Sequence, residues 1–358
     1  MEHFSCTTRI VSGPGAIKEL KNLNIQRLMV VTDPYFEKNG NAAGIASFSQ
    51  ESEIFSGIHP DPTVEQIALG TAAVKAFKPD TVVALGGGSA MDCAKAMVWF
   101  SGVKARLIAI PTTSGSGSEV TDFAVVTHEG IKHPLIDKTL QPELAILDSD
   151  LLEQLPKSLI ADTGFDVLAH ALEAYTAKNA SPFSDAFAKE AFCTAFANLP
   201  ASYNGKLEVR AKLHAAATMA GMAFSQAGLG LCHALSHTLG GMFHVPHGRL
   251  NAILLPAVVE LNAQTCPKRY AHMARCAGLG GSADTVAVRN LKNGLLRLRK
   301  ELELPASLAQ AGVDPRKVQQ RAGEIVKTAK ADPCYGTNPI QPEDFMLYRL
   351  LEEVTGRV

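Results

Sequence analysis

Short β-branched runs alternate with helical stretches through the first 150 residues, and this alternation constrains the fold most. The helical stretches include residues 64–77 and 90–100. The runs that are typical of strands are 27–32, 81–85, 106–110 and 143–147. Strands that alternate with helices predict a mainly parallel sheet with helices on both faces. The second and third runs are largely apolar, as expected of parallel strands buried on both faces.

The pattern changes after about residue 152. Alanine- and leucine-rich segments with helical periodicity dominate, which predicts a helical domain. The predicted helices are 158–177, 184–199, 207–227, 232–242, 249–261, 284–301 and 345–355. A chain of 358 residues that is 46% hydrophobic is long enough for two cores. We therefore expect an α/β domain at 1–154 and an all-α domain at 155–358, with Pro156 interrupting the pattern near the junction.

A glycine run follows the second predicted strand. The sequence G-G-G-S-A-M-D (86–92) places three glycines where the backbone turns sharply and can approach a ligand closely. Ser89 can cap the helix that follows, and the N-terminus of a helix offers N–H groups to an anion such as a pyrophosphate. The usual G-x-G-x-x-G fingerprint is absent because Met91 stands at its last glycine. The run indicates a phosphate site of a different design.

A second loop, P-T-T-S-G-S-G-S-E-V-T (111–121), follows the third strand. Such a run is compatible with a solvated loop. Open α/β sheets, however, bind ligands at the carboxyl ends of their strands, which favours ligand contact. The hydroxyl-bearing residues are Thr112, Thr113, Ser114, Ser116, Ser118 and Thr121.

Asp33 ends the first predicted strand. In the usual dinucleotide fold an acidic residue about 20 positions after the glycines binds the ribose. Here the best candidate precedes the glycines. Asp33 can accept hydrogen bonds from a ribose diol, or it can be a turn residue in T-D-P, and the sequence leaves both interpretations open.

Histidines cluster between residues 233 and 247. The chain has 11 histidines, and four lie within these 15 positions, namely His233, His237, His244 and His247. A lone histidine is more often a hydrogen-bonded core residue than a metal ligand. The i,i+4 spacing of His233 and His237 places both on one helix face. An H-E-x-x-H hydrolase motif is excluded because Ala234 follows His233.

Asp166 and His170 form a second i,i+4 pair, and they lie among apolar residues. A buried carboxylate is costly unless it is paired or coordinates a metal. The pair is therefore either half of a metal site or a hydrogen-bonded pair. A carboxylate with several imidazoles suits Fe²⁺ or Zn²⁺. Glu173, three residues after His170, either orients that ligand or lies on the helix surface.

Charge and cysteine content exclude several classes of protein. The net charge is -1, which argues against a broad nucleic-acid-binding surface. Seven scattered cysteines without a C-x-x-C pair favour a reduced, cytoplasmic chain. The N-terminus lacks the pattern of a signal peptide, and no apolar run is long enough to span a membrane.

The chain resembles the iron-containing, group III alcohol dehydrogenases in four motifs, at 86–92, 111–121, 164–175 and 232–252. The match also includes H-P-D-P-T (59–63), G-I-K-H-P (130–134) and Y-G-T-N-P (335–339), and it covers nearly the whole chain. Within the family, A-G-M-A-F-S-Q-A-G-L-G-L (220–231) is most similar to the 1-propanol dehydrogenases of propanediol-utilisation microcompartments. The four motifs are G-G-G-S-A-M-D (86–92), P-T-T-S-G-S-G-S-E-V-T (111–121), G-F-D-V-L-A-H-A-L-E-A-Y (164–175) and C-H-A-L-S-H-T-L-G-G-M-F-H-V-P-H-G-R-L-N-A (232–252).

The resemblance implies a role for each matching residue. The implied metal ligands are Asp166, His170, His233 and His247. His237 matches the non-ligand histidine near nicotinamide and substrate, and it is the implied proton relay. His244 and His214 match no site position. The implied cofactor contacts are Asp33, Gly87, Gly88, Ser89, Thr112, Thr113, Thr121, Phe123 and Lys132. The carboxylate of Asp33 favours NAD over NADP, because it would repel a 2′-phosphate.

The resemblance also implies the fold and the reaction. The fold is the dehydroquinate synthase-like architecture, with an α/β NAD-binding domain and an all-α metal-binding domain. The reaction interconverts a short primary alcohol and its aldehyde, with propanal and 1-propanol as one candidate pair. The cofactors are NAD(H) and Fe²⁺, with Zn²⁺ also possible. Catalysis is expected in the cleft between the domains.

The implied assembly is a homodimer or larger homo-oligomer, with association to a bacterial microcompartment as a possibility. Three other functions remain open from the residues alone. They are a polyol dehydrogenase or cyclase-type lyase of the same superfamily, a metal-dependent hydrolase, and a non-catalytic subunit that binds NAD or a metal.

Overall fold

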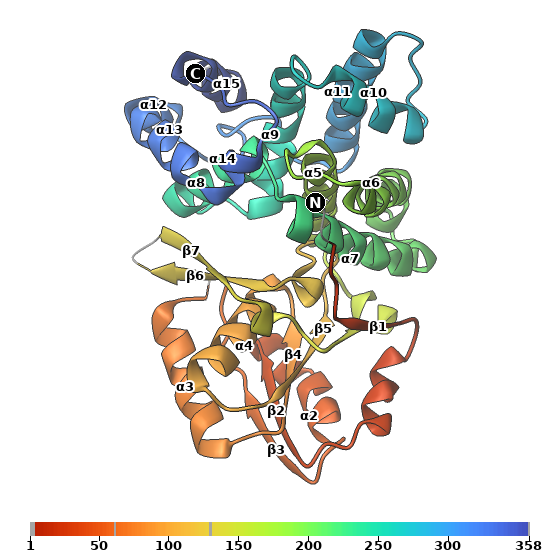
Figure 1. Cartoon of the computed structure of the whole chain (residues 1–358), viewed down its shortest axis with the longest axis vertical. Coiled ribbons are helices and arrows are strands. Elements are labelled where there is room, and N and C mark those ends of the chain that lie inside the picture. Colours follow the sequence, from red (N-terminus) through yellow and green to blue (C-terminus); the bar gives the residue numbers. More distant parts are fainter. Residues whose placement is uncertain (1–3, 61, 129–130, 357–358) are drawn as a thin grey trace. The chain divides into compact units, whose positions relative to one another are not determined.

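The computed structural model describes residues 4–60, 62–128 and 131–356, and the chain forms two compact units (Figure 1). One unit is Ser5–Leu155, and the other contains the chain from Pro156 onward together with Phe4. Each has its own secondary structure, the first mainly α/β and the second helical. None of the helices in the described part of the chain is long and apolar enough to cross a membrane.

The first unit is built on a parallel sheet. Among the described residues, six strands pair in the order β1-β8-β5-β4-β2-β3, and each of these pairings is parallel. Since β3 and β4 lie on opposite sides of β2, the strand order reverses between β2 and β4. The strands are β1 (Arg9–Ser12), β2 (Arg27–Thr32), β3 (Glu51–Phe55), β4 (Thr81–Gly86), β5 (Arg106–Pro111) and β8 (Leu144–Leu147).

Successive residues of the central strands enter opposite layers of the core. Met29 and Val31 of β2 pack in a cluster with side chains of α3 and α4. Leu28 and Val30 pack in a second cluster, with side chains of η1 and α2. Both faces of the sheet are therefore covered, which is why these strands lack a polar face. The covering elements are η1 (Ala16–Asn22), α2 (Asn41–Ala46), α3 (Val64–Phe77) and α4 (Gly88–Ser101).

Several elements of this unit differ from the sequence-based expectation. Two short helices that the sequence analysis did not predict follow β2, namely the five-residue α1 (Pro34–Lys38) and the six-residue α2. Strands β1 and β3 lie at the two edges of the sheet, and their partly exposed sequences carry no clear strand signal. An antiparallel hairpin of β6 (Phe123–His128) and β7 (Ile131–Ile136) follows the second loop.

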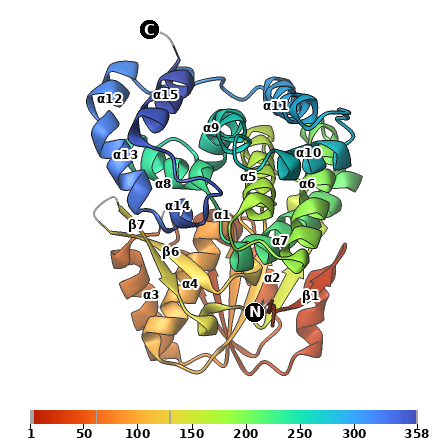
Figure 2. The ribbon, with the colours of Figure 1, turned by 45° about the horizontal axis from the view of Figure 1, so that its top comes forward.

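The second unit packs helices around α5 (Lys157–Thr176). This helix is buried around almost its whole circumference, and it contacts α6, α7 and α9 (Figure 2). A helix that is apolar on all sides belongs at the centre of a bundle. The other helices of this unit are α6 (Pro182–Tyr203), α7 (Arg210–Ala227), α8 (Leu231–Phe243), α9 (His247–Asn262), α10 (Pro267–Cys276), α11 (Asp284–Glu301), α12 (Pro315–Gln320), α13 (Ala322–Ala331), α14 (Pro333–Thr337) and α15 (Asp344–Thr355).

Candidate active site

The loops after β2, β4 and β5 leave the sheet side by side, at the carboxyl ends of these strands. The register pairs Thr32 with Leu85 and Gly86 with Pro111, so the carboxyl ends of these strands are adjacent. The strand order reverses between β2 and β4, and open α/β sheets bind ligands at such a point. The sheet topology therefore brings Asp33, the glycine run and the hydroxyl-rich loop together at the carboxyl ends of the central strands.

Glycines allow the two loops to pack against each other. Gly86 has φ 152°, a conformation that favours glycine, and its carbonyl accepts a hydrogen bond of 3.0 Å from Thr112 N–H. A Cβ on Gly87 would lie 3.3 Å from the Thr113 hydroxyl, and one on Gly88 would lie 3.1 Å from Ser116. Larger residues here would push the loops apart.

The expectation that Ser89 caps the following helix is wrong. Helix α4 begins at Gly88 with Gly87 as its N-cap, so Ser89 lies inside the first turn. The helix begins one residue before Ser89. Its N-cap residue is a glycine, so no side chain of the N-cap residue bonds to the first N–H groups. A first turn without a side-chain cap suits an anion that accepts hydrogen bonds from its N–H groups.

Asp33 has the cap role and retains a second oxygen. Its Oδ1 accepts hydrogen bonds from Tyr35 N–H at 2.8 Å and Phe36 N–H at 3.2 Å, which fixes the start of α1. Its Oδ2 lies on the side of the glycine run, 3.8 Å from the position of a Cβ on Gly86. The turn and the ribose-binding interpretations are therefore compatible, because they use different oxygens.

A buried lysine, which the sequence analysis missed, fastens the second loop to α4. Lys95 Nζ donates to the Thr121 carbonyl and hydroxyl, both at 2.9 Å, and to the Phe123 carbonyl at 2.8 Å. Burial lowers the pKa of Lys95 to about 8, and the nearby carboxylates oppose this shift, so the ammonium is still mostly protonated at neutral pH. One turn earlier, Asp92 accepts a hydrogen bond of 2.7 Å from the Ser118 hydroxyl.

These contacts bear on two of the predicted cofactor residues, Thr121 and Phe123, and leave the prediction for Lys132 untested. The hydroxyl of Thr121 is bonded to Lys95, so Thr121 helps to shape the loop. Phe123 begins β6, and its ring lies 5.9 Å from the Lys95 ammonium. Lys132 belongs to β7, and its side chain lies outside the described residues.

Three helices of the second unit bring the predicted metal ligands together. Asp166 and His170 lie one turn apart on α5 and are 7% and 5% exposed. His233 lies in the first turn of α8 and is 1% exposed. His247 is the first residue of α9, and its side chain is 28% exposed. The group is thus open to solvent only on the His247 side.

The spacing of the Asp166, His233 and His247 donors fits a metal ion, whereas His170 lies outside this mutually close set. Asp166 Oδ1 lies 3.8 Å from His170 Nδ1, 3.6 Å from His233 Nε2 and 3.5 Å from His247 Nε2. These distances exceed the 2.7–3.2 Å of ordinary N–H···O bonds. Ligands about 2.1 Å from a tetrahedral ion lie about 3.4 Å from one another. The donors of Asp166, His233 and His247 all lie within 4.8 Å of one another.

The electrostatics of the group also favour a cation. Burial opposes ionisation of Asp166, but the imidazoles of His170 and His247 hold its pKa well below its usual range. For His233, burial opposes the charged form, yet the nearby carboxylates of Asp166 and Glu173 raise its pKa to about 9. The carboxylate is therefore ionised, as a metal ligand must be.

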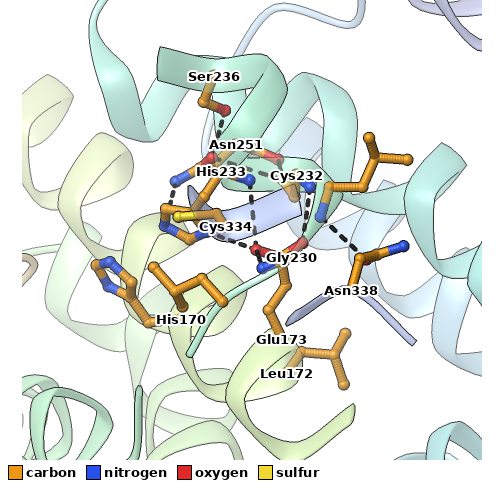
Figure 3. Close-up of polar contacts among 12 residues, drawn as sticks. His170, Leu172, Glu173, Gly230, Cys232, His233, Ser236, Asn251, Cys334 and Asn338 are labelled. Carbon is orange, nitrogen blue, oxygen red and sulfur yellow. Dashed lines mark hydrogen bonds and ion pairs between the residues drawn. The ribbon is translucent and has the colours of Figure 1, made fainter. Parts of the chain in front are cut away.

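Glu173 orients His233. Its Oε2 lies 2.7 Å from His233 Nδ1, and its carboxylate accepts hydrogen bonds from Gly230 N–H at 3.0 Å and Cys232 N–H at 2.7 Å (Figure 3). A carboxylate only accepts, so Nδ1 carries a proton. When the ring is neutral, Nε2 therefore faces Asp166 with a lone pair that a metal can bind. The sequence analysis expected Glu173 to orient His170 or to lie on the surface. Glu173 is instead 2% exposed, and the imidazole that it contacts is that of His233.

Asn251 holds the opposite side of the group. Its Nδ2 donates to Asp166 Oδ1 at 2.8 Å, and its Oδ1 accepts hydrogen bonds from Ser236 and Cys232 (Figure 3). Asn251 is fully buried and lies one turn after His247 on α9. Sequence analysis missed it, although the i,i+4 spacing from His247 is a usable signal.

Gly248 allows α9 to approach α5. A Cβ at this position would lie 1.9 Å from the carbonyl oxygen of Asp162. Only glycine fits so close to another backbone, and this approach brings His247 beside Asp166. Arg249 then pairs with the Asp162 carboxylate at 2.9 Å. The P-H-G-R sequence therefore positions a ligand by backbone contact.

The remaining histidines have separate roles. His237 lies one turn after His233, and its Nδ1 is 2.8 Å from Asp332 Oδ2. His244 has φ 56° and ends α8, so it is an exposed cap residue. His214 is buried in α7. The group of donors around Asp166 therefore includes neither His214 nor His244.

We predict that Lys95→Met weakens NADH binding about tenfold or more, because several buried acceptors of the second loop lose their donor. Titration of NADH fluorescence measures the dissociation constant. The matched control is Lys75→Met, an exposed lysine on α3, which should bind NADH like the wild type. A folded Lys95→Met protein with unchanged affinity would contradict the assignment.

We predict that Gly248→Ala lowers the free energy of unfolding by about 3 kcal/mol, because the added methyl overlaps the Asp162 backbone. Iron content should fall as well, since His247 moves away from Asp166. Denaturant titration and metal analysis measure the two effects. Gly240→Ala is the control, because a Cβ there would lie 3.5 Å from the Leu250 side chain, an ordinary van der Waals contact. Equal stability of the two variants would rule out the close approach.

Comparison with known proteins identifies the family of this chain. Residues 7–149 match the family described as iron-containing alcohol dehydrogenase, and residues 160–355 match the C-terminal part of the same family. The 1-propanol dehydrogenase PduQ of Citrobacter freundii is 42% identical, covering 99% of this chain and all of that protein. An NADPH-dependent butanol dehydrogenase of Clostridium saccharobutylicum is 37% identical over 95% of each chain.

The fold is shared with solved structures. The sulfoacetaldehyde reductase of Bifidobacterium kashiwanohense, in complex with NAD⁺, superimposes with a TM-score of 0.88 at 25% identity, covering 99% of this chain and 98% of that one. The predicted fold class is confirmed, and the hydrolase, lyase and non-catalytic alternatives are not favoured. The chain belongs to the iron-containing alcohol dehydrogenase family, a group of oxidoreductases that use NAD(H) and Fe²⁺.

Proposed function

We propose that this protein interconverts a short primary alcohol and its aldehyde, and that Asp166, His170, His233 and His247 hold its iron. The observation that carries the proposal is the set of distances from Asp166 Oδ1 to three imidazoles, 3.5–3.8 Å. These distances suit donors around a shared ion and are too long for hydrogen bonds. Zn²⁺ fits the same donors, so the native metal is part of the test.

Each part of the chain has a task in this reaction. Bound Fe²⁺ supplies Lewis-acid polarisation of the carbonyl oxygen, and the nicotinamide supplies or accepts the hydride. Glu173 and Asn251 fix the orientation of the ligands. His237, whose side chain is 25% exposed, gives a proton to the product alkoxide or takes one from the alcohol. The edge of the sheet with Gly87, Gly88, Ser89, Thr112 and Thr113 is the proposed cofactor site.

The substrate proposal rests on the full-length similarity to 1-propanol dehydrogenase. We propose propanal and 1-propanol as the working pair, a cytoplasmic location with association to a bacterial microcompartment, and a homodimer or larger homo-oligomer. The decisive experiment is anaerobic reconstitution with Fe²⁺ or Zn²⁺, followed by rate measurements on short aldehydes and alcohols with NAD(H) and NADP(H). Absence of turnover with every C2–C4 substrate would overturn the proposal.

We predict that His247→Ala abolishes tight iron binding, because the site loses an imidazole donor 3.5 Å from Asp166 Oδ1. Metal analysis after reconstitution and desalting measures it. His244→Asn is the control, since asparagine tolerates the positive φ at that position. If His247→Ala kept full iron content and full rate, the ligand assignment would be wrong.

We predict that Asp33→Ser lowers the preference for NADH over NADPH by about tenfold or more, because a carboxylate that repels the 2′-phosphate is removed. Serine retains the ability to cap α1. The ratio of kcat/KM for the two cofactors measures the effect. The NADPH-dependent relative makes this test informative. An unchanged ratio would show that Asp33 serves only as a helix cap.

A further inference from the structure

Asp332 and Cys334 surround His237 on the side away from its own helix. Asp332 is the N-cap of α14, and its Oδ1 accepts a hydrogen bond of 2.8 Å from Cys334 N–H. Its Oδ2 lies 2.8 Å from His237 Nδ1. The side chains of His237 and Asp332 are 25% and 15% exposed. The three donor groups lie within 4.8 Å of one another.

The distances distinguish this group from the one around Asp166. An ion about 2.1 Å from a nitrogen and an oxygen would separate them by about 3.4 Å. The 2.8 Å between His237 Nδ1 and Asp332 Oδ2 is instead the length of a charge-assisted hydrogen bond. Burial also raises the pKa of Cys334 well above its usual range, so its sulfur stays a neutral thiol. The group is therefore a hydrogen-bonded pair beside a thiol.

Asp332 is fixed and ionised. Burial acts to raise the pKa of Asp332, but the hydrogen bonds from His237 and the Cys334 backbone outweigh it and lower the pKa below its usual value. An ionised carboxylate accepts hydrogen bonds and cannot donate them. The proton between Asp332 and His237 therefore belongs to Nδ1 of the imidazole, which leaves Nε2 with a lone pair when the ring is neutral.

We propose that Asp332 is a positioning residue that holds His237 in the Nδ1–H tautomer, with Nε2 as the atom that exchanges the substrate proton. The proposal deepens the proposed function and rests on it. In alcohol oxidation the O–H bond breaks, an N–H bond forms at Nε2, and the hydride leaves to the nicotinamide. The resulting imidazolium is stabilised by the Asp332 carboxylate. Aldehyde reduction runs the same proton transfer in reverse.

The first test is Asp332→Asn. Asparagine also caps helices, so α14 keeps its start. Its amide can donate to Nδ1 and thereby favours the wrong tautomer. With the iron-loaded protein we expect kcat to fall about 100-fold, with KM for NADH and iron content unchanged. Asp332→Glu keeps the carboxylate and should recover most of the loss. Equal losses in both variants would overturn the proposal.

A matched variant controls for the helix cap. Asp314 begins α12 with the same Asp-Pro sequence, and its Oδ1 accepts from Arg316 N–H at 2.9 Å. Asp314→Asn should leave kcat within about twofold of the wild type, since no histidine depends on that carboxylate. A kcat loss in Asp314→Asn equal to that in Asp332→Asn would assign the effect to capping and overturn the proposal.

A double-mutant cycle separates positioning from support of the fold. If Asp332 acts through His237, Asp332→Asn has no further effect on kcat in a His237→Ala background. If Asp332 only supports the packing of α14, the two losses multiply. Multiplied losses would overturn the proposal, and a single shared loss would support it.

A spectroscopic measurement works without turnover. In zinc-loaded protein, ¹⁵N shifts of the His237 ring should show a protonated Nδ1 and an unprotonated Nε2, and Asp332→Asn should reverse this pattern. At a pH at which the ring is neutral, a protonated Nε2 in the wild type would overturn the proposal whatever the activity. If the tautomer is as expected but no alcohol or aldehyde turns over, the proposed function fails while the tautomer assignment stands.

Discussion

The buried carboxylate of Asp166 is the charge on which the helical unit depends. It lies at 7% exposure on a helix that is otherwise packed on nearly every side. An isolated carboxylate in such a place would cost several kcal/mol. The surrounding imidazoles and the Asn251 amide compensate by favouring the ionised form. Helices α8 and α9 thus place polar side chains around this carboxylate, and the same side chains form the candidate iron site.

Positioning in this site comes from contacts behind the ligands. Glu173 accepts hydrogen bonds from the first turn of α8 and from the His233 ring, so a single carboxylate both begins the helix and sets the tautomer of its ligand. Gly248 acts by lacking a side chain, because the Asp162 backbone occupies the space. A ligand held this way cannot adjust freely when the ion is exchanged. Rigid support of this kind is what metal affinity requires.

The sequence predicted the elements that carry strong patterns and missed those that do not. Helix α3 has the predicted bounds, and β2 spans the predicted run, because periodicity and burial agree there. The edge strand β3 and the short helix α14 were not predicted, since partial exposure and short length leave weak patterns. The residues proposed as ligands were implied by the resemblance of the motifs to a known family. Their supports, such as Asn251 and Asp332, depend on contacts between distant segments, which one sequence does not reveal.

In both units a buried charged side chain determines where the polar groups around it lie. Lys95 sits on a helix next to the glycine run and is satisfied by the oxygens of the neighbouring loop, so the loop takes its shape from the ammonium. In the same way, the imidazoles of His170, His233 and His247 are arranged around the carboxylate of Asp166. In each case the cost of burying a charge is offset only by one arrangement of polar partners. Since that arrangement is also the proposed binding surface, the interactions that stabilise the fold prepare the protein for its ligands.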